Sequence, residues 1–338
     1  MNIYDLARAS GVSIATASKA LNGRVDVNAE TRSRVIETAR RLDYHPSHMA
    51  RGLARRRTEN IGVVALRRYK VPFFTNPFYS HVIEGMEQEV TLRNYNLLLS
   101  ILPADDPAVV PFQLPRLVRE KNADGLVLLG QMPPELTREV SERGIPGVFV
   151  DFHAHGLSGR FVLTDNRDGE RRLVEHLARL GHRRLAFVQS GVPDWSFAER
   201  QAGFESACEA MGAGHEIWHV PALEWPVIEA ELGRRLSGPG RPTAVLAVND
   251  EHALAVLRSA EAVGLRVPED LSVAGFDDIE GAGYAKPRLC TVKVDKISMG
   301  RRAIQHVFEM MEKPLERESL EQLPVELVIG ESTGPARR

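Results

Sequence analysis

Polar residues that can bind a small molecule stand at the ends of several apolar segments between residues 147 and 277 of the chain. Asp151, Asn249 and Asp277 each follow such a segment directly, and Ser196 and Arg200 lie shortly after a fourth. In parallel sheets, ligands bind outside the carboxyl ends of the strands. Each residue alone could instead be a helix N-cap or half of a surface ion pair. Four strand ends facing one cleft favour a shared binding site.

The charges of this group indicate what kind of ligand it suits. A ligand with a planar carboxylate or a phosphate would require surplus positive charge in the site. Here a single arginine, Arg200, is balanced by two acids, Asp151 and Asp277. This set favours a neutral ligand that carries many hydroxyl groups.

A second group that can recognise a ligand lies near the N-terminus, on a segment predicted to be a short helix over residues 14–21. Lys19 can donate hydrogen bonds to guanine O6 and N7, whereas Ile14 and Ala15 can make apolar contact with a thymine methyl group. The alternative is a solvated amphipathic helix without a partner. We expect further contacts to DNA phosphates from five neighbouring residues, which are Tyr4, Ser13, Thr16, Ser18 and Asn22.

The elements around this segment predict a helix-turn-helix. Three helices are expected over 3–10, 14–21 and 29–42, and each follows a residue that can cap a helix: Asn2, Ser13 and Asn28. Gly11 suits the left-handed turn that ends the first helix. Two short helices joined by a glycine turn and covered by a third form this motif, whose second helix enters the major groove.

The charge distribution supports a polyanion-binding head. Residues 1–57 hold eleven Lys and Arg against five Asp and Glu, a formal charge of +6, so the rest of the chain carries −8 to reach the total of −2. A basic module on an acidic body is typical of nucleic-acid binding, although a basic surface helix without a partner would also fit the charge alone.

The remainder of the chain alternates apolar strands with amphipathic helices. Strands are predicted over 61–66, 96–101, 125–129, 147–151, 160–164, 184–189, 244–248 and 271–276. Helices are predicted between them, for example over 80–93, 169–180, 198–211 and 251–263. This pattern indicates parallel sheets covered on both faces. This number of strand–helix units is too large for a single sheet. We therefore expect an α/β core of two doubly wound lobes.

Several classes of protein do not fit the sequence. No apolar run reaches the ~20 residues of a membrane helix, and the N-terminus MNIYDLARAS does not resemble a signal peptide. The two cysteines, Cys208 and Cys290, form no disulfide framework and no metal-binding spacing, which favours a cytoplasmic protein. Common catalytic and phosphate-binding motifs are missing, so we expect neither an enzyme nor a bound metal or cofactor.

The run IYDLARASGVSIATASKALNG, followed by ETRSRVIETARRLDYHPSHMARGL and the strand IGVV, resembles the LacI/GalR family of transcription regulators. A departure is Ala17, where the family usually carries Val. The resemblance implies a DNA-binding headpiece over 1–45 and a hinge helix over 46–58 that folds when two subunits meet DNA. It places Leu53 as the residue that wedges between base steps in the minor groove.

The resemblance continues through HLARLGHRRLAF, ERQAGF, TAVLAVNDEHALAVL, VPEDLSVAGFDDIE and PVELVIGEST. It implies a core like that of periplasmic sugar-binding proteins, with one lobe from 59–162 and 291–323 and the other from 163–290 and 324–332. Arg200 then matches an arginine that clamps effector oxygens, and Asp277 matches an acid that accepts from effector hydroxyls. Four further positions match the effector pocket: Phe78, Asp151, Trp225 and Asn249. Val294 and Lys296 depart from the polar or aromatic residues of some sugar-responding members.

The combined prediction is a transcription regulator, most plainly a repressor, whose operator affinity is set by a sugar. An aromatic plate such as Trp225 suits the apolar face of a pyranose, and it also suits a nucleobase, so a purine effector is the alternative. A periplasmic-type solute receptor shares the core fold but would lack the basic head. One headpiece reads few base pairs, so we expect a homodimer on a pseudo-palindromic operator. The end ESTGPARR carries no heptads for a tetramer-forming coiled coil.

Overall fold

The computed structural model describes residues 2–24, 26–44, 57–67, 73–103, 114–154, 159–221, 225–313 and 317–337. The chain divides into two compact units, Met1–Glu59 and Asn60–Arg338, which are treated separately below. Most of the predicted hinge, including Leu53, lies outside the described residues.

The first unit is a bundle of three short helices, α1 (Ile3–Ser10), α2 (Ile14–Leu21) and α3 (Ala29–Arg41). The predicted caps are confirmed: Asn2 and Asp5 form a capping box, and Ser13 and Asn28 accept hydrogen bonds from the first turns of α2 and α3. Gly11 has the left-handed φ of 67° that ends α1. The shared core contains Leu6, Ala7, Ala17, Ala20, Val27, Val35 and Ala39.

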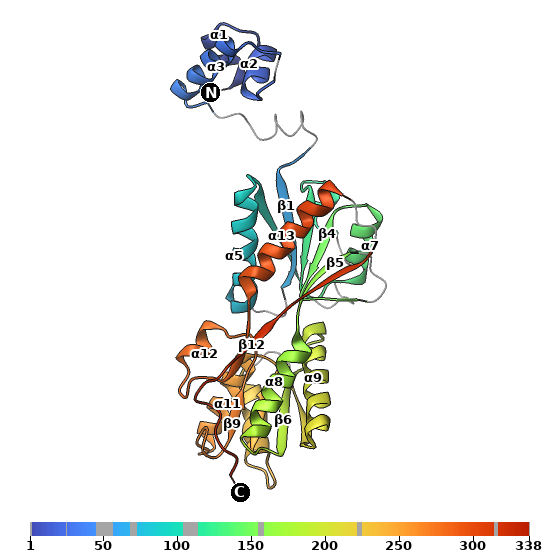
Figure 1. Ribbon diagram of the computed structural model, residues 1–338, viewed down its shortest axis with the longest axis vertical. Helices are drawn as coiled ribbons and strands as arrows, with labels where there is room; N and C mark the ends of the chain where they lie inside the picture. The colour runs from blue at the N-terminus through green and yellow to red at the C-terminus, as the bar shows by residue number, and fades with distance from the viewer. Residues whose placement is uncertain are drawn as a thin grey trace. The chain divides into compact units, whose positions relative to one another are not determined.

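One lobe of the second unit is built on a six-stranded sheet whose strand pairs are all parallel. In sheet order its strands are β11 (Ser319–Leu323), β5 (Arg160–Thr164), β4 (Gly147–Val150), β3 (Gly125–Leu129), β1 (Asn60–Arg67) and β2 (Asn96–Pro103). The elements around it are η1 (Phe73–Thr75), α5 (Pro77–Leu92), α6 (Arg116–Arg119), α7 (Pro134–Glu142) and α13 (Lys296–Glu312). Figure 1 shows α5 and α13 side by side on one face of this sheet.

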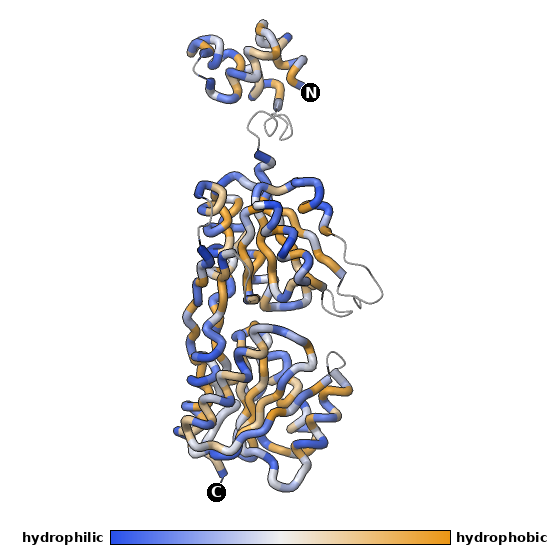
Figure 2. Tube along the Cα trace, turned by 90° about the vertical axis from the view of Figure 1, so that its right-hand side faces the viewer, coloured by the Kyte–Doolittle hydropathy of each residue, from blue (hydrophilic) through white to orange (hydrophobic). Residues whose placement is uncertain are grey.

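The other lobe holds a four-stranded parallel sheet. In sheet order its strands are β7 (Gly214–Val220), β6 (Arg184–Ser190), β8 (Ala244–Ala247) and β9 (Ser272–Ala274). Its helices are α8 (Asn166–Arg179), α9 (Trp195–Met211), α10 (Trp225–Leu236), α11 (Asp250–Ala262) and α12 (Glu280–Tyr284). The strands of both lobes are apolar and lie inside, as the hydrophobic colour along the middle of each lobe in Figure 2 shows.

The chain passes between the lobes three times. It leaves β5 for α8, it leaves β10 (Thr291–Val294) for α13, and it leaves β11 for β12 (Val325–Val328). β10 and β12 form an antiparallel pair, which lies between the lobes in Figure 1. The backbone N–H of Asp277 donates to Val292 O at 2.8 Å, which ties β10 to the end of the β9 segment. The exact lobe boundaries stay a prediction.

All eight predicted strands are present, and the four predicted helices of this unit begin one to three residues before the predicted starts. Each true start is set by a side-chain cap: Asn76, Asp165, Asp194 and Asn249. The sequence reading missed β7, β10, β11 and β12; of these, the edge strands β7 and β11 carry several exposed polar residues. In the described part of the chain, we find no helix with the length and apolar character needed to cross a bilayer.

Candidate functional site

The predicted base-reading residues lie together on one side of α2. Ile14, Ala15 and Lys19 are exposed, whereas Ala17 and Ala20 on the opposite side are buried against α1 and α3. Ile14 is unusual in exposing 41% of its surface despite its apolar side chain. A helix that buries only alanines and exposes an isoleucine and a lysine fits an outward-facing recognition surface.

The predicted phosphate-contacting residues surround this surface, and part of their hydrogen-bonding capacity is used within the headpiece. Tyr4 is exposed at the start of α1. The hydroxyls of Ser13 and Thr16 lie 2.8 Å apart, and the Asn22 side-chain amide donates to Ser18 O at 2.8 Å. Hydroxyl groups can still accept or donate a second hydrogen bond, so phosphate contact by these residues stays a prediction.

A cavity of about 200 Å³ lies within the second unit and gathers residues from both lobes. Six of the seven predicted effector residues line it, namely Phe78, Asp151, Arg200, Trp225, Asn249 and Asp277. The remaining lining residues are Leu66, Phe73, Asn76, Pro77, Tyr79, Ser190, Val192, Asp194, Phe197, Ile228, Glu251, His252 and Ile279. Ser196 is outside this lining, because it is buried behind Asp151 and donates to that carboxylate. The predicted direct contact of Ser196 with the effector is therefore wrong for this cavity, and Ser196 instead holds the Asp151 carboxylate.

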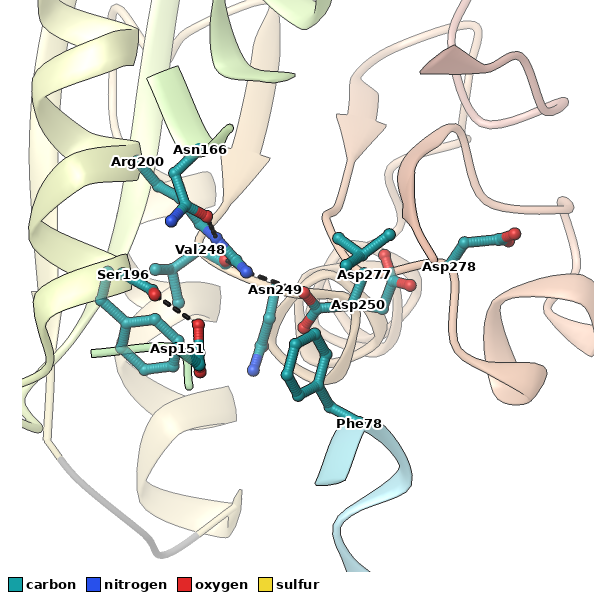
Figure 3. A network of polar contacts seen from close by, with 12 residues as sticks. Phe78, Asp151, Asn166, Ser196, Arg200, Val248, Asn249, Asp250, Asp277 and Asp278 are labelled. Atoms are coloured by element: carbon teal, nitrogen blue, oxygen red, sulfur yellow. Dashed lines mark hydrogen bonds and ion pairs between the residues drawn. The ribbon is translucent and has the colours of Figure 1, made fainter. Parts of the chain in front are cut away.

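Arg200 is the centre of the polar network shown in Figure 3. It stands on the second turn of α9 and is only 2% exposed. Its Nε donates to Asn166 Oδ1 at 2.9 Å, its Nη1 to Val248 O at 2.7 Å, and its Nη2 to Asp277 Oδ1 at 2.8 Å. The guanidinium carbon also lies 3.8 Å from the ring centroid of Phe276. Of the five N–H donors of arginine, two remain for a ligand.

The two carboxylates that face this network differ in their partners. Asp277 forms a buried ion pair with Arg200, and burial raises its pKa while the guanidinium opposes part of that rise. Asp151 follows β4 with a left-handed φ of 57° and accepts from the hydroxyl of Tyr79 at 2.9 Å and from Ser196. Burial, and then the neighbouring charge of Asp194, raise the pKa of Asp151 to about 7.

Asn249 and His252 form the part of the wall next to Trp225. Asn249 Oδ1 caps α11 by accepting from His252 N at 3.0 Å, and it also lies 2.7 Å from His252 Nδ1. Because this oxygen only accepts, Nδ1 carries the proton and Nε2 is left as an unprotonated acceptor. Burial lowers the pKa of His252 to about 4, so the ring is neutral at pH 7. The ring centroids of Trp225 and His252 are 5.6 Å apart.

The sequence reading missed several members of the site. Asn166 orients Arg200, and Tyr79, Glu251 and His252 line the cavity. Asn166, Glu251 and His252 lie in the first turns of helices that directly follow a predicted strand, which is a detectable signal. Tyr79 is adjacent to Phe78 on α5, and nothing in its spacing distinguishes it from a core aromatic.

Taken together, the cavity offers hydrogen-bond donors and acceptors beside several aromatic rings, as a binding site for a small polar molecule requires. Among the described residues, no group of three or more His, Cys, Asp and Glu side chains is placed to hold a metal ion. The arrangement can bind and orient a ligand.

Comparisons with known proteins match both units. Residues 2–47 match the family model described as bacterial regulatory proteins, lacI family, and residues 174–333 match the periplasmic binding protein-like domain. The chain is 30% identical over 332 residues to the HTH-type transcriptional repressor PurR of Vibrio cholerae, covering 95% of each chain. The fold is similar to the Lac repressor dimer bound to operator and the anti-inducer ONPF (TM-score 0.85, 24% identity, 99% of each chain). It is also similar to a LacI family transcriptional regulator from Enterococcus faecium with bound ribose (TM-score 0.70, 25% identity, 82% of this chain and 100% of the other).

Proposed function

This chain belongs to the LacI family of bacterial regulatory proteins and is a DNA-binding transcription regulator, and on that premise we propose that a sugar bound around Arg200 sets its affinity for an operator. The observation that carries the effector half of this proposal is the environment of Arg200. A guanidinium that is 2% exposed, held at three nitrogens and placed in a cavity wall is preorganised for a ligand.

On the DNA side, we propose that α2 lies in the major groove. Lys19 then reads a guanine, Ile14 and Ala15 make apolar contacts with bases, and the residues around the N-termini of α1 and α2 bind phosphates. The regulator acts as a cytoplasmic homodimer on a pseudo-palindrome, in keeping with the similar Lac repressor dimer, which is bound to operator. Leu53 is proposed to wedge into the minor groove between the two half-sites.

A sugar is favoured by the donors and acceptors of the cavity and by the similar regulator with bound ribose. The second candidate is a purine. Trp225 favours it, because 37% of this residue is exposed and its ring can stack on a base. The acidic lining, with Asp151 and Glu251, fits hydroxyl donors better than it fits a flat base with few donors.

Control of DNA binding follows from linkage. An effector changes operator affinity only if it binds the DNA-competent and DNA-incompetent arrangements of the protein unequally, and the operator must then change effector affinity by the same factor. The three chain crossings between the lobes and the cavity residues drawn from both lobes give a ligand the means to bias one lobe arrangement over another.

The effector half is tested with Arg200→Ala, whose operator binding and ligand response are measured by fluorescence anisotropy on the duplex selected from a random library. We expect operator affinity within about threefold of wild type and loss of the ligand response. Arg167→Ala, which removes an exposed arginine from the neighbouring helix α8, is the control and should keep the response. A response retained in Arg200→Ala would place the effector elsewhere, and a circular dichroism melt separates loss of function from loss of fold.

The DNA half is tested in the same library selection with Lys19→Ala. Loss of one bidentate base contact should cost ~1 to 3 kcal/mol and relax the preference at one position in each half-site. An unchanged base preference would remove Lys19 from the reading surface.

A further inference from the structure

We propose that His252 determines the specificity of the effector site by accepting a hydrogen bond from one hydroxyl group of a bound sugar. Its ring lines the cavity beside Trp225, Asn249 fixes which ring nitrogen carries the proton, and the other nitrogen has no partner among the described residues. This inference rests on the sugar-controlled function proposed above and deepens it, because it names a residue that selects among sugars.

His252 is placed in the cavity wall by the start of α11. Asn249 lies just beyond β8 and caps this helix, and His252 is the third residue of the helix. Ligands bind outside the carboxyl ends of parallel strands, and His252 borders the cavity at such an end. Only 8% of its surface is exposed. The residue is therefore part of a buried wall and not of an open surface.

The hydrogen bonds of Asn249 fix the direction of donation. Its Oδ1 accepts from the backbone N–H of His252 at 3.0 Å, and because a backbone N–H can only donate, this atom is the amide oxygen. The same oxygen lies 2.7 Å from His252 Nδ1, which must therefore carry the ring proton. The amide nitrogen of Asn249 is left as a donor, and Nε2 of His252 is left as an acceptor.

Two effects keep the His252 ring neutral, as an acceptor must be. Burial lowers its pKa to about 4. The first turn of a helix also carries the positive end of the helix dipole, which disfavours a cation there. At pH 7 the lone pair of Nε2 is therefore free to accept a hydrogen bond.

This lone pair is unused within the described part of the chain. Nε2 is buried and forms no hydrogen bond with any of the described residues. A buried acceptor without a donor is costly, and most such atoms are paired in native proteins. Because the ring belongs to the cavity wall, we assign the missing donor to the ligand.

The neighbour of His252 indicates what kind of ligand carries that donor. The rings of Trp225 and His252 have centroids 5.6 Å apart and planes inclined by 64°. An aromatic ring suits the apolar C–H face of a sugar, whose hydroxyl groups project from its rim. In a sugar packed on Trp225, one rim hydroxyl donates to His252 Nε2, and a neighbouring oxygen accepts from the Asn249 amide.

Such a contact discriminates strongly between related sugars. A site that binds a buried hydroxyl group rejects the analogue without it, because the protein group is then left unpaired. Hydrogen or fluorine in place of the hydroxyl cannot donate to Nε2. If His252 only supported the fold through Asn249, its replacement would weaken the binding of all these analogues by the same factor.

The test is a double-mutant cycle between protein and ligand, measured by isothermal titration calorimetry on the full-length protein at pH 7. D-ribose, D-glucose, D-galactose and D-mannose are titrated first. The tightest binder is then compared with its monodeoxy and monofluoro analogues at each non-anomeric hydroxyl. At one position, both analogues should bind wild type at least tenfold more weakly than the parent sugar. In His252→Phe, which keeps a ring and removes the acceptor, this loss should fall below threefold.

Further variants separate recognition from folding. His252→Gln offers an acceptor oxygen near the place of Nε2 and should regain at least part of the selectivity. His252→Leu lacks both ring and acceptor and should behave as His252→Phe does, so the test still decides if the phenylalanine ring destabilises the protein. His219→Phe replaces an exposed histidine of β7 in the same lobe and should keep the wild-type pattern.

Two results would overturn the inference. One is a loss of equal size in wild type and in the variants without an acceptor at every hydroxyl position, which is the pattern of a purely structural histidine. The other is the failure of all four sugars to bind at concentrations up to 50 mM.

Failure of the inference and failure of the proposed function give different results. If a sugar binds and shifts operator affinity through Arg200 while no hydroxyl position depends on His252, the function stands and the inference is wrong. If one hydroxyl depends on His252 but the sugar leaves operator affinity unchanged, the specificity residue stands and the proposed control of DNA binding falls.

Discussion

Lys19 Nζ lies 2.6 Å from Asp26 Oδ2 and forms an ion pair within the headpiece. Lys19 belongs to α2, and Asp26 lies in the connection that leads to α3. Both side chains are about half exposed, and the hydrogen bond from Lys19 lowers the pKa of Asp26, so the carboxylate stays charged at neutral pH. The lysine proposed to read a base is thus held by its own domain, and DNA binding has to break a weak surface pair.

Asp26→Asn should therefore raise operator affinity. The substitution removes the competing carboxylate, and because exposed ion pairs stabilise only weakly, the gain should be at most about fivefold. Anisotropy titrations at several salt concentrations measure it. Glu37→Gln removes the same charge from an exposed position on α3 and serves as the control. Equal gains in both variants would mean that net charge matters and the release of Lys19 does not.

The main features of the effector site could be read from the sequence because strand ends converge. Asp151 follows β4 of the six-stranded sheet, and Asn249 and Asp277 follow β8 and β9 of the four-stranded sheet. Ligands bind outside the carboxyl ends of parallel strands, and the structure brings all three residues to one cavity. The helix-turn-helix was predictable because its caps are local, as Asn2 and Ser13 show. These features depend on short-range patterns.

Other features depend on long-range geometry and could not be predicted. Ser196 was predicted to contact the effector, but α9 already begins at Trp195, after its cap Asp194, and Ser196 donates to Asp151 instead. Asn166 meets Arg200 across 34 residues, and Lys296 reaches Asp277 across 19. Such pairs follow from how two elements pack, which local periodicity does not encode.

Gly300 allows α13 to approach α5 closely, and Gly300→Ala should destabilise the core. A Cβ atom at Gly300 would overlap the carbonyl oxygen of Val82, and a Cβ atom at Gly85 would overlap the carbonyl oxygen of Ile297. Because both overlaps are with backbone atoms, a larger residue at either position would have to push the two helices apart. Overpacking of this kind costs ~1 to 3 kcal/mol. Urea unfolding of Gly300→Ala should show the loss. Gly283→Ala, where a Cβ meets open space, should be near neutral, and equal losses would contradict the packing explanation.

Asp151 should make the stability of the protein depend on pH in a defined window. Burial, followed by the charge of Asp194, raises its pKa from 3.8 in the unfolded chain to about 7. The native state then binds a proton that the unfolded state has released, so this residue lowers the free energy of unfolding as pH rises from about 4 to 7. Asp151→Asn removes this loss, and its stability relative to wild type should rise across that window and level off above it.

Asp270 provides the opposite case for the same urea titrations. Hydrogen bonds from Arg266 lower the pKa of Asp270 to about 2, so this carboxylate stabilises the native state above pH 4 and loses its effect as pH falls toward 2. Asp270→Asn should therefore be less stable than wild type at neutral pH.

For Asp151, a difference in stability between Asp151→Asn and wild type that does not change with pH would show that Asp151 titrates normally in the folded protein.

Lys296 should hold the Asp277 side of the effector site in place. It is the first residue of α13, where the helix dipole opposes a cation, yet it is 8% exposed. Its ammonium donates to the carbonyl oxygens of Asp277 and, at 3.2 Å, of Asp278. These two residues have φ values of 105° and 51°, which lie in the left-handed region that non-glycine residues rarely occupy.

Lys296→Met removes the donor and keeps most of the side-chain volume, so the strained turn should relax and Asp277 should lose its fixed position opposite Arg200. We expect at least a tenfold loss of affinity for the sugar that binds wild type most tightly, measured by calorimetry. Operator binding in the absence of that sugar should be unchanged. Lys293→Met removes an exposed lysine of β10 and should change neither. Because a general loss of stability would lower both affinities together, the separation of the two affinities decides whether Lys296 positions the effector site or merely supports the fold.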